Sequence, residues 1–301
     1  MPQVCKPPAV MTLMRWWKRA AYLTIGLIWA CDRTITAAPS DYSRTPVLFV
    51  HGHGMSSGIW QEMMNHLVSL GYPREYLYAV DIIPNDMANV KAATTVLEPA
   101  ATSLLENAKV VARSAGYQGE ASQRLDIVSH SMGAVSSRWY TVKLHPELVR
   151  TWISVAGANH GTNVLCGYTD EAAREMCPAF ATSTEKSAVQ VALNGTTVAP
   201  LDETPYGLGI DGARTTSIPP DSTRSILYFT LRIELDEWIK PENSAVLNGA
   251  GGAHVRVPSG VPVKETSPGN YLFQAKVGHD PLPKHPDLIH FVAALLAARD
   301  Q

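Results

Sequence analysis

Short apolar runs alternate with helical patterns along the chain after residue 46. The runs with the length and composition of buried strands are residues 47–50, 76–82, 125–129, 152–156, 226–231 and 271–277. Helical periodicity fills the spaces between them at residues 60–70, 99–112, 132–144 and 286–299. Strands separated by helices predict an α/β fold, with a mostly parallel sheet and helices on both of its faces.

The segment from about 163 to 224 interrupts this alternation. It holds two cysteines and many Thr, Pro, Gly and Asp residues, and it shows no clear period. A long segment without a pattern of its own is usually functional or crosses an active site. We therefore expect one domain over residues 39–301, in which residues 163–224 form a cap- or lid-like insertion.

The N-terminal residues follow the order of a signal peptide. Basic residues precede an apolar run at 20–31, and small residues follow at 36–38. The run is shorter than the roughly 20 residues that span a bilayer, so a permanent membrane helix is the weaker interpretation. The sequence predicts a signal peptide over residues 1–38 and a secreted or periplasmic protein. A lipobox-like tetrad ending at Cys31 leaves lipoprotein anchoring as an alternative, although its second residue fits that motif poorly.

Charge and cysteine content narrow the class of protein. The formal net charge is -2, with 46% hydrophobic residues and no long run of one sign. This composition is typical of a globular protein and argues against a nucleic-acid partner. Removal of the signal peptide leaves Cys166 and Cys177 of the four cysteines. In an exported chain this close pair suggests a disulfide, and two buried free thiols are the alternative.

Residues 125–133 combine a strand pattern, a small-x-Ser-x-Gly turn and the start of a helical pattern. This is the context of a nucleophile elbow, a sharp turn that lifts a serine hydroxyl above the sheet. The residues two before and two after Ser131 must be small, and they are Ser129 and Gly133. Glycine is usual at the first of these positions. Ser131 is therefore the candidate nucleophile, and an ordinary strand-to-helix turn is the alternative.

This segment resembles the nucleophile region of bacterial lipases, of the small Bacillus type and of class 2. Residues 50–54 and 157–162 are similar to the turns that follow two core strands in those families. The resemblance covers most of residues 46–162 and 226–298, and it does not extend well over 163–224. It implies an α/β-hydrolase fold and a monomeric serine esterase or lipase without a cofactor. An ester or lipid substrate and transient contact with a lipid interface are also implied.

A serine hydroxyl needs a base to take its proton and a carboxylate to orient that base. In this fold the chain order is Ser, then Asp or Glu, then His. The acid must follow a strand, and the resemblance points to Asp236, after the strand at 226–231. Glu234 and Glu237 are neighbouring alternatives. Asp126 lies upstream on the nucleophile's own strand, where we expect it to tie strands together.

The same order excludes the histidines that precede Ser131 as the base. The resemblance points to His279, which follows the last strand and precedes the final helix. His160 is the main rival, but it comes before the acid in the chain. The other histidines after the nucleophile are His145, His254, His285 and His290.

The reaction also needs two donors for the oxyanion of the tetrahedral intermediate. One is the backbone N–H of Met132, directly after the nucleophile. By resemblance, the other is the backbone N–H of His53. The glycines on both sides of His53 allow the backbone to approach the ester closely.

Three alternatives use other chemistry or other substrates. A secreted polyester depolymerase, for example one that cleaves polyhydroxyalkanoates, would use the same serine mechanism. A metal-dependent hydrolase is the second alternative, which the turn at residues 51–53 and the ten histidines suggest. Two histidines around one glycine lack the further ligands of such a site, so we expect no metal. A non-catalytic binding protein on the same fold is the third alternative.

Overall fold

A computed structural model of the protein describes residues 38–180, 187–196, 198–208 and 225–299. Cys31 and all but the last residue of the predicted signal peptide lie outside the described residues, so these predictions remain untested. Nothing in the described part of the chain forms a helix of the length and apolarity that a membrane span requires.

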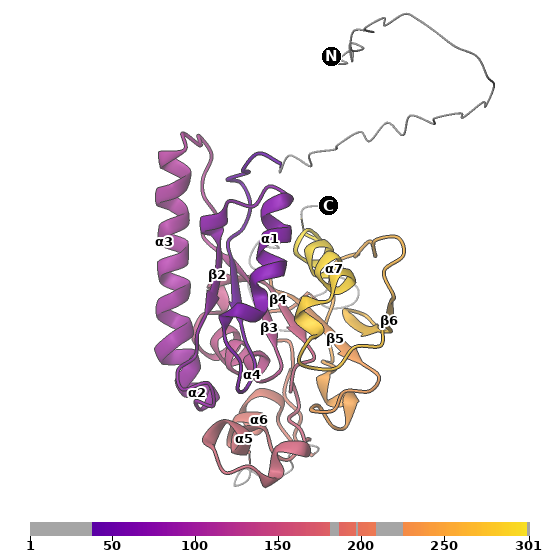
Figure 1. The fold of residues 1–301 in the computed structure, drawn as a ribbon. Helices are drawn as coiled ribbons and strands as arrows, with labels where there is room; N and C mark the ends of the chain where they lie inside the picture. The colour runs from indigo at the N-terminus through magenta and orange to yellow at the C-terminus, as the bar shows by residue number, and fades with distance from the viewer. Residues whose placement is uncertain (1–37, 181–186, 197, 209–224, 300–301) are drawn as a thin grey trace, which may run out of the picture. The chain divides into compact units, whose positions relative to one another are not determined.

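Among the described residues, seven strands form one sheet in the order β2-β1-β3-β4-β5-β7-β6 (Figure 1). The strands are β1 Val47–Val50, β2 Leu77–Val80, β3 Leu125–His130, β4 Val149–Val155, β5 Leu227–Ile233, β6 Val263–Ser267 and β7 Asn270–Phe273. Every neighbouring pair is parallel except β6 with β7. The predicted α/β class with a mostly parallel sheet is confirmed, and β6 is an added strand at the edge.

The helices follow the predicted positions with shifted ends. The α-helices are α1 Gln61–Ser69, α2 Asn89–Ala92, α3 Glu98–Ser114, α4 Met132–Trp139, α5 Glu171–Met176, α6 Ala188–Asn194 and α7 Pro286–Leu296. Shorter 3-10 and π turns are η1 Ser57–Trp60, η2 Arg74–Tyr76, η3 Ala93–Leu97, η4 Tyr140–Leu144, η5 Pro146–Leu148, η6 Val164–Gly167, η8 Glu242–Ala245 and η9 Leu282–Lys284. The turn η4 continues α4 to the end of the helix that the sequence predicts.

Two apolar cores lie on the two faces of the sheet. Successive residues of a strand point to opposite faces, so β1 serves both cores. Leu48 and Val50 pack in the core that includes residues of α3 and α4. Val47 and Phe49 pack in the core that includes residues of α1 and α7. Burial on both faces explains why the strands read as continuous apolar runs.

The parallel strands bring the candidate site residues to one edge of the sheet. The turn at residues 51–53 follows β1, Ser131 follows β3, Asp236 lies beyond β5, and His279 lies beyond β7. Carboxyl ends of parallel strands lie at the same edge, where ligands bind in open α/β sheets. The order of strands thus collects residues that are far apart in the sequence.

The described part of the 163–224 segment is not without structure. It contains η6, α5 and α6, and the two helices lie side by side (Figure 1). Helices of six and seven residues are too short to show a clear period in the sequence. The role of this segment as a cap or lid remains a prediction.

Candidate active site

Ser131 occupies a sharp turn between β3 and α4. Its backbone has φ 55° and ψ -123°, a conformation that is strained for any residue other than glycine. The N–H of Ser131 donates to the carbonyl of Val155 at 3.1 Å, and its carbonyl accepts from the N–H of Ala158 at 3.3 Å. Strand β4 and the loop after it therefore hold the strained turn in place.

The residues around the turn are small because other backbone lies against them. A Cβ atom on Gly133 would lie 2.5 Å from the carbonyl oxygen of His51, and one on Gly52 would lie 2.8 Å from Cβ of Ser131. Ser129 occupies the position where glycine is usual. It is fully buried, and its hydroxyl donates to the carbonyl of Ile153 at 3.0 Å. A carbonyl of β4 thus accepts a hydrogen bond from the hydroxyl that serine introduces in place of the usual glycine.

Asp236 and His279 form a buried pair. Nδ1 of His279 lies 2.9 Å from Oδ1 and 3.0 Å from Oδ2 of Asp236, and each residue is 1% exposed. Oδ1 also accepts from the backbone N–H groups of Trp238 and Ile239, at 2.9 and 2.8 Å. The carboxylate is therefore fixed in place. Nε2 of His279 is buried and has no hydrogen-bond partner among the described residues, which leaves it free to act on a proton.

His130, the residue before Ser131, contacts His279 directly. Its Nε2–H donates to the carbonyl of His279 at 3.1 Å, and the two ring centroids are 4.5 Å apart. Burial lowers the pKa of His130 well below its ordinary value, and the nearby His279 lowers it further. A neutral ring therefore ties the loop of His279 to the strand that presents Ser131.

The other acidic candidates have different partners. Glu237 accepts the backbone N–H of His279 at 3.0 Å, and Glu234 is exposed. Asp126 accepts from Arg150 on β4, with a closest contact of 2.7 Å. Asp126 therefore joins two strands, as its position in the sequence suggests, and of these acids it is Asp236 that contacts the ring of His279 through its side chain.

His51 is part of the framework of the first turn. Its Nδ1–H donates to the carbonyl of Gly52 at 2.8 Å, and its Nε2 accepts the N–H of Ile82 at 2.9 Å. Burial lowers the pKa of His51 and keeps the ring neutral. Both ring nitrogens are thus engaged by backbone, so His51 has no lone pair for the metal ion that the spacing of residues 51–53 suggests.

The two backbone donors expected for the oxyanion lie at the start of α4 and in the first turn. Met132 is the first residue of α4, where an N–H has no acceptor within the helix. In the first turn, the N–H of Gly54 donates to the carbonyl of Asn85 at 3.0 Å, and that of Met55 donates to Gly52 at 3.2 Å. No backbone hydrogen bond from His53 is found among the described residues.

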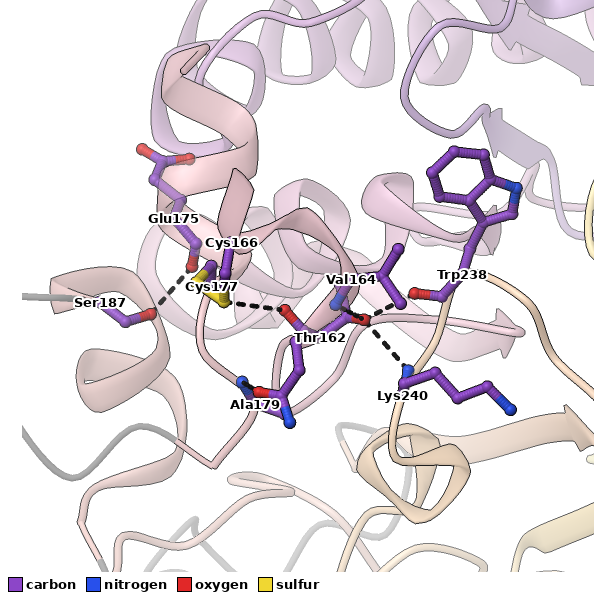
Figure 2. The surroundings of a disulfide bond; sticks show 10 residues. Thr162, Val164, Cys166, Glu175, Cys177, Ala179, Ser187, Trp238 and Lys240 are labelled. Carbon is purple, nitrogen blue, oxygen red and sulfur yellow. Dashed lines mark hydrogen bonds between the residues drawn. A yellow bond between two sulfur atoms is a disulfide. The ribbon is translucent and has the colours of Figure 1, made fainter. Parts of the chain in front are cut away.

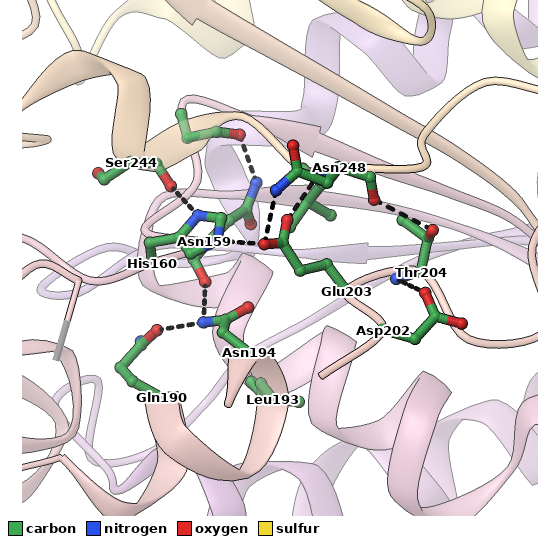
Figure 3. Close-up of polar contacts among 12 residues, drawn as sticks. Asn159, His160, Gln190, Leu193, Asn194, Asp202, Glu203, Thr204, Ser244 and Asn248 are labelled. Carbon is green, nitrogen blue, oxygen red and sulfur yellow. Dashed lines mark hydrogen bonds and ion pairs between the residues drawn. The ribbon is translucent and has the colours of Figure 1, made fainter. Parts of the chain in front are cut away.

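His160, the rival base, lies in a separate polar cluster (Figure 3). Its Nδ1–H donates to the carbonyl of Ser244 at 3.1 Å, and its Nε2 pairs with Oε1 of Glu203 at 3.1 Å. Burial raises the pKa of Glu203, but hydrogen bonds from His160 and Asn248 outweigh burial and leave this pKa lowered. Both ring nitrogens face acceptors, so neither is free to take a proton from a serine.

Of the remaining histidines, His254 is exposed, and the others have structural surroundings. His145 pairs with the carboxylates of Glu98 and Glu147. His285 caps α7, because its Nδ1 accepts the N–H of Asp287 at 3.3 Å. His290 packs on His66, with ring centroids 4.7 Å apart.

The predicted disulfide between Cys166 and Cys177 is present, with 5.1 Å between the Cα atoms. Figure 2 shows that Thr162 links the start of this segment to the loop after Asp236. The hydroxyl of Thr162 donates to the carbonyl of Trp238 at 2.6 Å and accepts the N–H of Lys240 at 3.0 Å. Thr162, which precedes Cys166 in the chain, therefore connects the stretch leading into the disulfide with the loop after Asp236.

Comparison with known proteins gives a family match and several more distant similarities. Residues 44–185 match the family model described as Lipase (class 2). Among solved structures, the mature lipase BlEst2 of Bacillus licheniformis is 14% identical, covering 86% of this chain and 95% of that one, with a TM-score of 0.49. Lipase B of Aspergillus fumigatus is 14% identical, covering 87% and 64%, with a TM-score of 0.47.

Among curated proteins, the human protein ABHD8 is 27% identical over 130 residues, which are 42% of this chain and 26% of ABHD8. The bovine protein ABHD8 is also 27% identical over 130 residues, which are 27% of that protein. The chain therefore spans about a quarter of the length of these curated relatives.

Proposed function

We propose, from the premise that the chain belongs to the class 2 lipase family of α/β-hydrolases through residues 44–185, that it is a serine carboxylic ester hydrolase. Its proposed substrates are triacylglycerols or other acyl esters. The observation that carries the proposal is the buried Asp236–His279 pair, with Nε2 of His279 free, at the sheet edge that presents Ser131. This pair and this turn supply the acid, base and nucleophile of acyl transfer.

Acylation begins with attack of the Ser131 hydroxyl oxygen on the ester carbonyl carbon. Nε2 of His279 takes the hydroxyl proton as the new C–O bond forms. The carboxylate of Asp236 accepts the Nδ1–H of the same ring, which selects the tautomer with a free Nε2 and stabilises the imidazolium that results.

The tetrahedral intermediate carries a negative charge on the former carbonyl oxygen. The N–H groups of Met132 and His53 are the proposed donors to this oxygen. Donors fixed before the reaction stabilise the developing charge without reorganisation. Two observations support this proposal: the N–H of Met132 has no acceptor within α4, and no backbone hydrogen bond from His53 is found among the described residues.

The intermediate collapses when the imidazolium of His279 gives its proton to the leaving alkoxide. An acyl-enzyme on Ser131 and a free alcohol result. Water then repeats the attack with His279 as base, and release of the carboxylic acid restores the serine. The sequence of steps requires no cofactor.

We propose that the protein is exported and acts as a monomer in transient contact with a lipid surface. The signal-peptide pattern of residues 1–38 and the Cys166–Cys177 disulfide support export, because disulfides persist in oxidising compartments. Lipid anchoring at Cys31 is the alternative to release.

Hydrolysis of a p-nitrophenyl ester series and of emulsified triglyceride tests the proposal. Wild type should cleave esters, Ser131→Ala should not, and Ser103→Ala, an exposed serine on α3, should match wild type. A wild-type protein that cleaves none of these esters would contradict it. Release of hydroxyalkanoate oligomers from a polyester film, without fatty acid from triglyceride, would favour the depolymerase.

A further inference from the structure

We infer that Asp170, in the disulfide-closed segment between Cys166 and Cys177, is a positioning residue for the proposed oxyanion turn at His53. The inference rests on the proposed function and adds a residue from the predicted cap- or lid-like segment, within the range 44–185 that matches the family model. The disulfide-closed segment then has a role in the proposed active site.

Asp170 joins the segment to the turn through one carboxylate oxygen. Oδ1 accepts Nε2–H of His53 at 3.2 Å, across 117 positions of sequence. The same oxygen accepts the N–H of Ala173 at 2.8 Å, which makes Asp170 the N-cap of α5. The helix cap and the contact with His53 therefore hold the carboxylate in a single orientation.

The turn depends on such an anchor because its backbone is permissive. Gly52 and Gly54 flank His53, and Gly54 has φ 70°. Contacts to the Gly52 carbonyl and from the Gly54 N–H hold the two flanking peptides, and glycine on both sides leaves His53 between them to be positioned through its own side chain. Asp170 holds the ring of His53 and so adds a further point of attachment to this turn.

The anchor is itself connected to the opposite side of the site. Tyr168 lies edge-on to His53, with ring centroids 6.3 Å apart, and edge-on to Trp238 at 6.4 Å. The backbone N–H of Trp238 in turn donates to Asp236. The disulfide-closed segment thus spans from the proposed oxyanion turn to the loop that carries the proposed catalytic acid.

This contact should affect catalysis more than folding. The side chains of His53 and Asp170 are 26% and 20% exposed, and polar contacts this exposed to solvent add little to stability. A donor displaced by a fraction of an ångström, however, weakens stabilisation of the transition state. Loss of the contact should therefore lower kcat and leave KM nearly unchanged.

Substitutions at Asp170 separate the helix cap from the contact with His53. Asp170→Ser keeps a good N-cap but is too short to reach the ring, so kcat should fall about tenfold with KM within about twofold of wild type. Asp170→Asn keeps an acceptor for both partners and should restore kcat. Glu171→Gln, an exposed neighbour in the same helix, should match wild type.

A double-mutant cycle tests whether Asp170 acts through His53. In a His53→Ala background, Asp170→Ser should produce no further loss of kcat. A full additional tenfold loss there, or wild-type kcat in Asp170→Ser alone, would overturn the inference. Ester hydrolysis by wild type separates the two failures. The proposed function fails if wild type cleaves none of the esters, whereas the inference alone fails if wild type is active and the Asp170 variants give either of these results.

Discussion

The strand-end residues and the disulfide-closed segment meet at the site but are held there in different ways. Asp236 and His279 are 1% exposed and lie in loops that buried parallel strands bring together. Asp170 and His53 are 20% and 26% exposed, and their side of the site depends on one disulfide and a few polar contacts. We therefore expect the sheet to hold the residues that the proposed reaction requires, and the disulfide-closed segment to affect only the rate of that reaction.

Asp236→Asn should have the largest effect on activity. An amide cannot select and stabilise the required form of the His279 ring, so kcat should fall about 10⁴-fold. Ester hydrolysis under saturating substrate measures this change, with the exposed Glu234→Gln as control. A loss below tenfold would show that Asp236 is not the catalytic acid. The buried strand-end pair would then not account for the activity.

Removal of the disulfide should affect stability strongly and activity moderately. The bond closes a short loop between cysteines 11 positions apart, and the double variant Cys166→Ser, Cys177→Ser should lose about 3 kcal/mol in the free energy of unfolding. Because Asp170 loses its rigid support, kcat should fall about tenfold. Urea unfolding and ester hydrolysis give the two values. Unchanged stability, or a loss of activity as large as that of Asp236→Asn, would contradict the comparison.

Matched glycine substitutions compare the two regions directly. Gly133→Ala puts a Cβ atom against the backbone of residues 50 and 51, and it should cost about 1–3 kcal/mol of stability together with most of the activity. Gly167→Ala in the segment meets no atom within 4 Å and should be nearly neutral. Thermal melts and ester assays of both variants test this contrast, and equal effects would break it.

The pH dependence of stability should also differ between His130, beside Ser131, and Glu203, in the polar cluster of His160. The pKa of His130 lies well below its ordinary value of 6.5, because burial, His279 and His51 disfavour its charged form. The unfolded chain then binds more protons between the two pKa values, so stability is complete above about pH 6.5 and falls as the pH drops. Glu203 has a lowered pKa, and its contribution is lost only as the pH falls below about 4.5.

Melting temperatures of wild type and His130→Gln between pH 8 and pH 5 test this prediction. Wild type should lose more stability than the variant across that range. His51 and His66 also have lowered pKa values and add the same trend to both proteins, so the difference between the curves is the relevant quantity. Parallel curves would show that His130 does not contribute.

The sequence predicts the strand-end region well because buried parallel strands leave a strong apolar pattern. The chain order of nucleophile, acid and base then excludes the histidines before Ser131 as the base. In the structure, His279 pairs with Asp236. The edge strand β6 was missed because four of its five residues are exposed, and an exposed edge strand carries no apolar run.

The disulfide-closed segment was harder to predict. Its helices are short, and its contacts are single hydrogen bonds between distant residues. Nothing in the sequence near Asp170 indicates His53 as its partner, since the two residues lie beyond β4 and β1, which the sheet brings together through β3. The one strong signal there was the close pair of cysteines.

Labelling with a serine-reactive phosphonate tests the central claim most directly, because the reagent reports the activated nucleophile itself. Mass spectrometry of the digested protein should find one adduct per chain, on Ser131, with ester hydrolysis lost in proportion to labelling. Ser131→Ala should take up no label and cleave no ester. A stoichiometric adduct on another serine, or undiminished ester hydrolysis by Ser131→Ala, would contradict the assignment of Ser131 as the nucleophile.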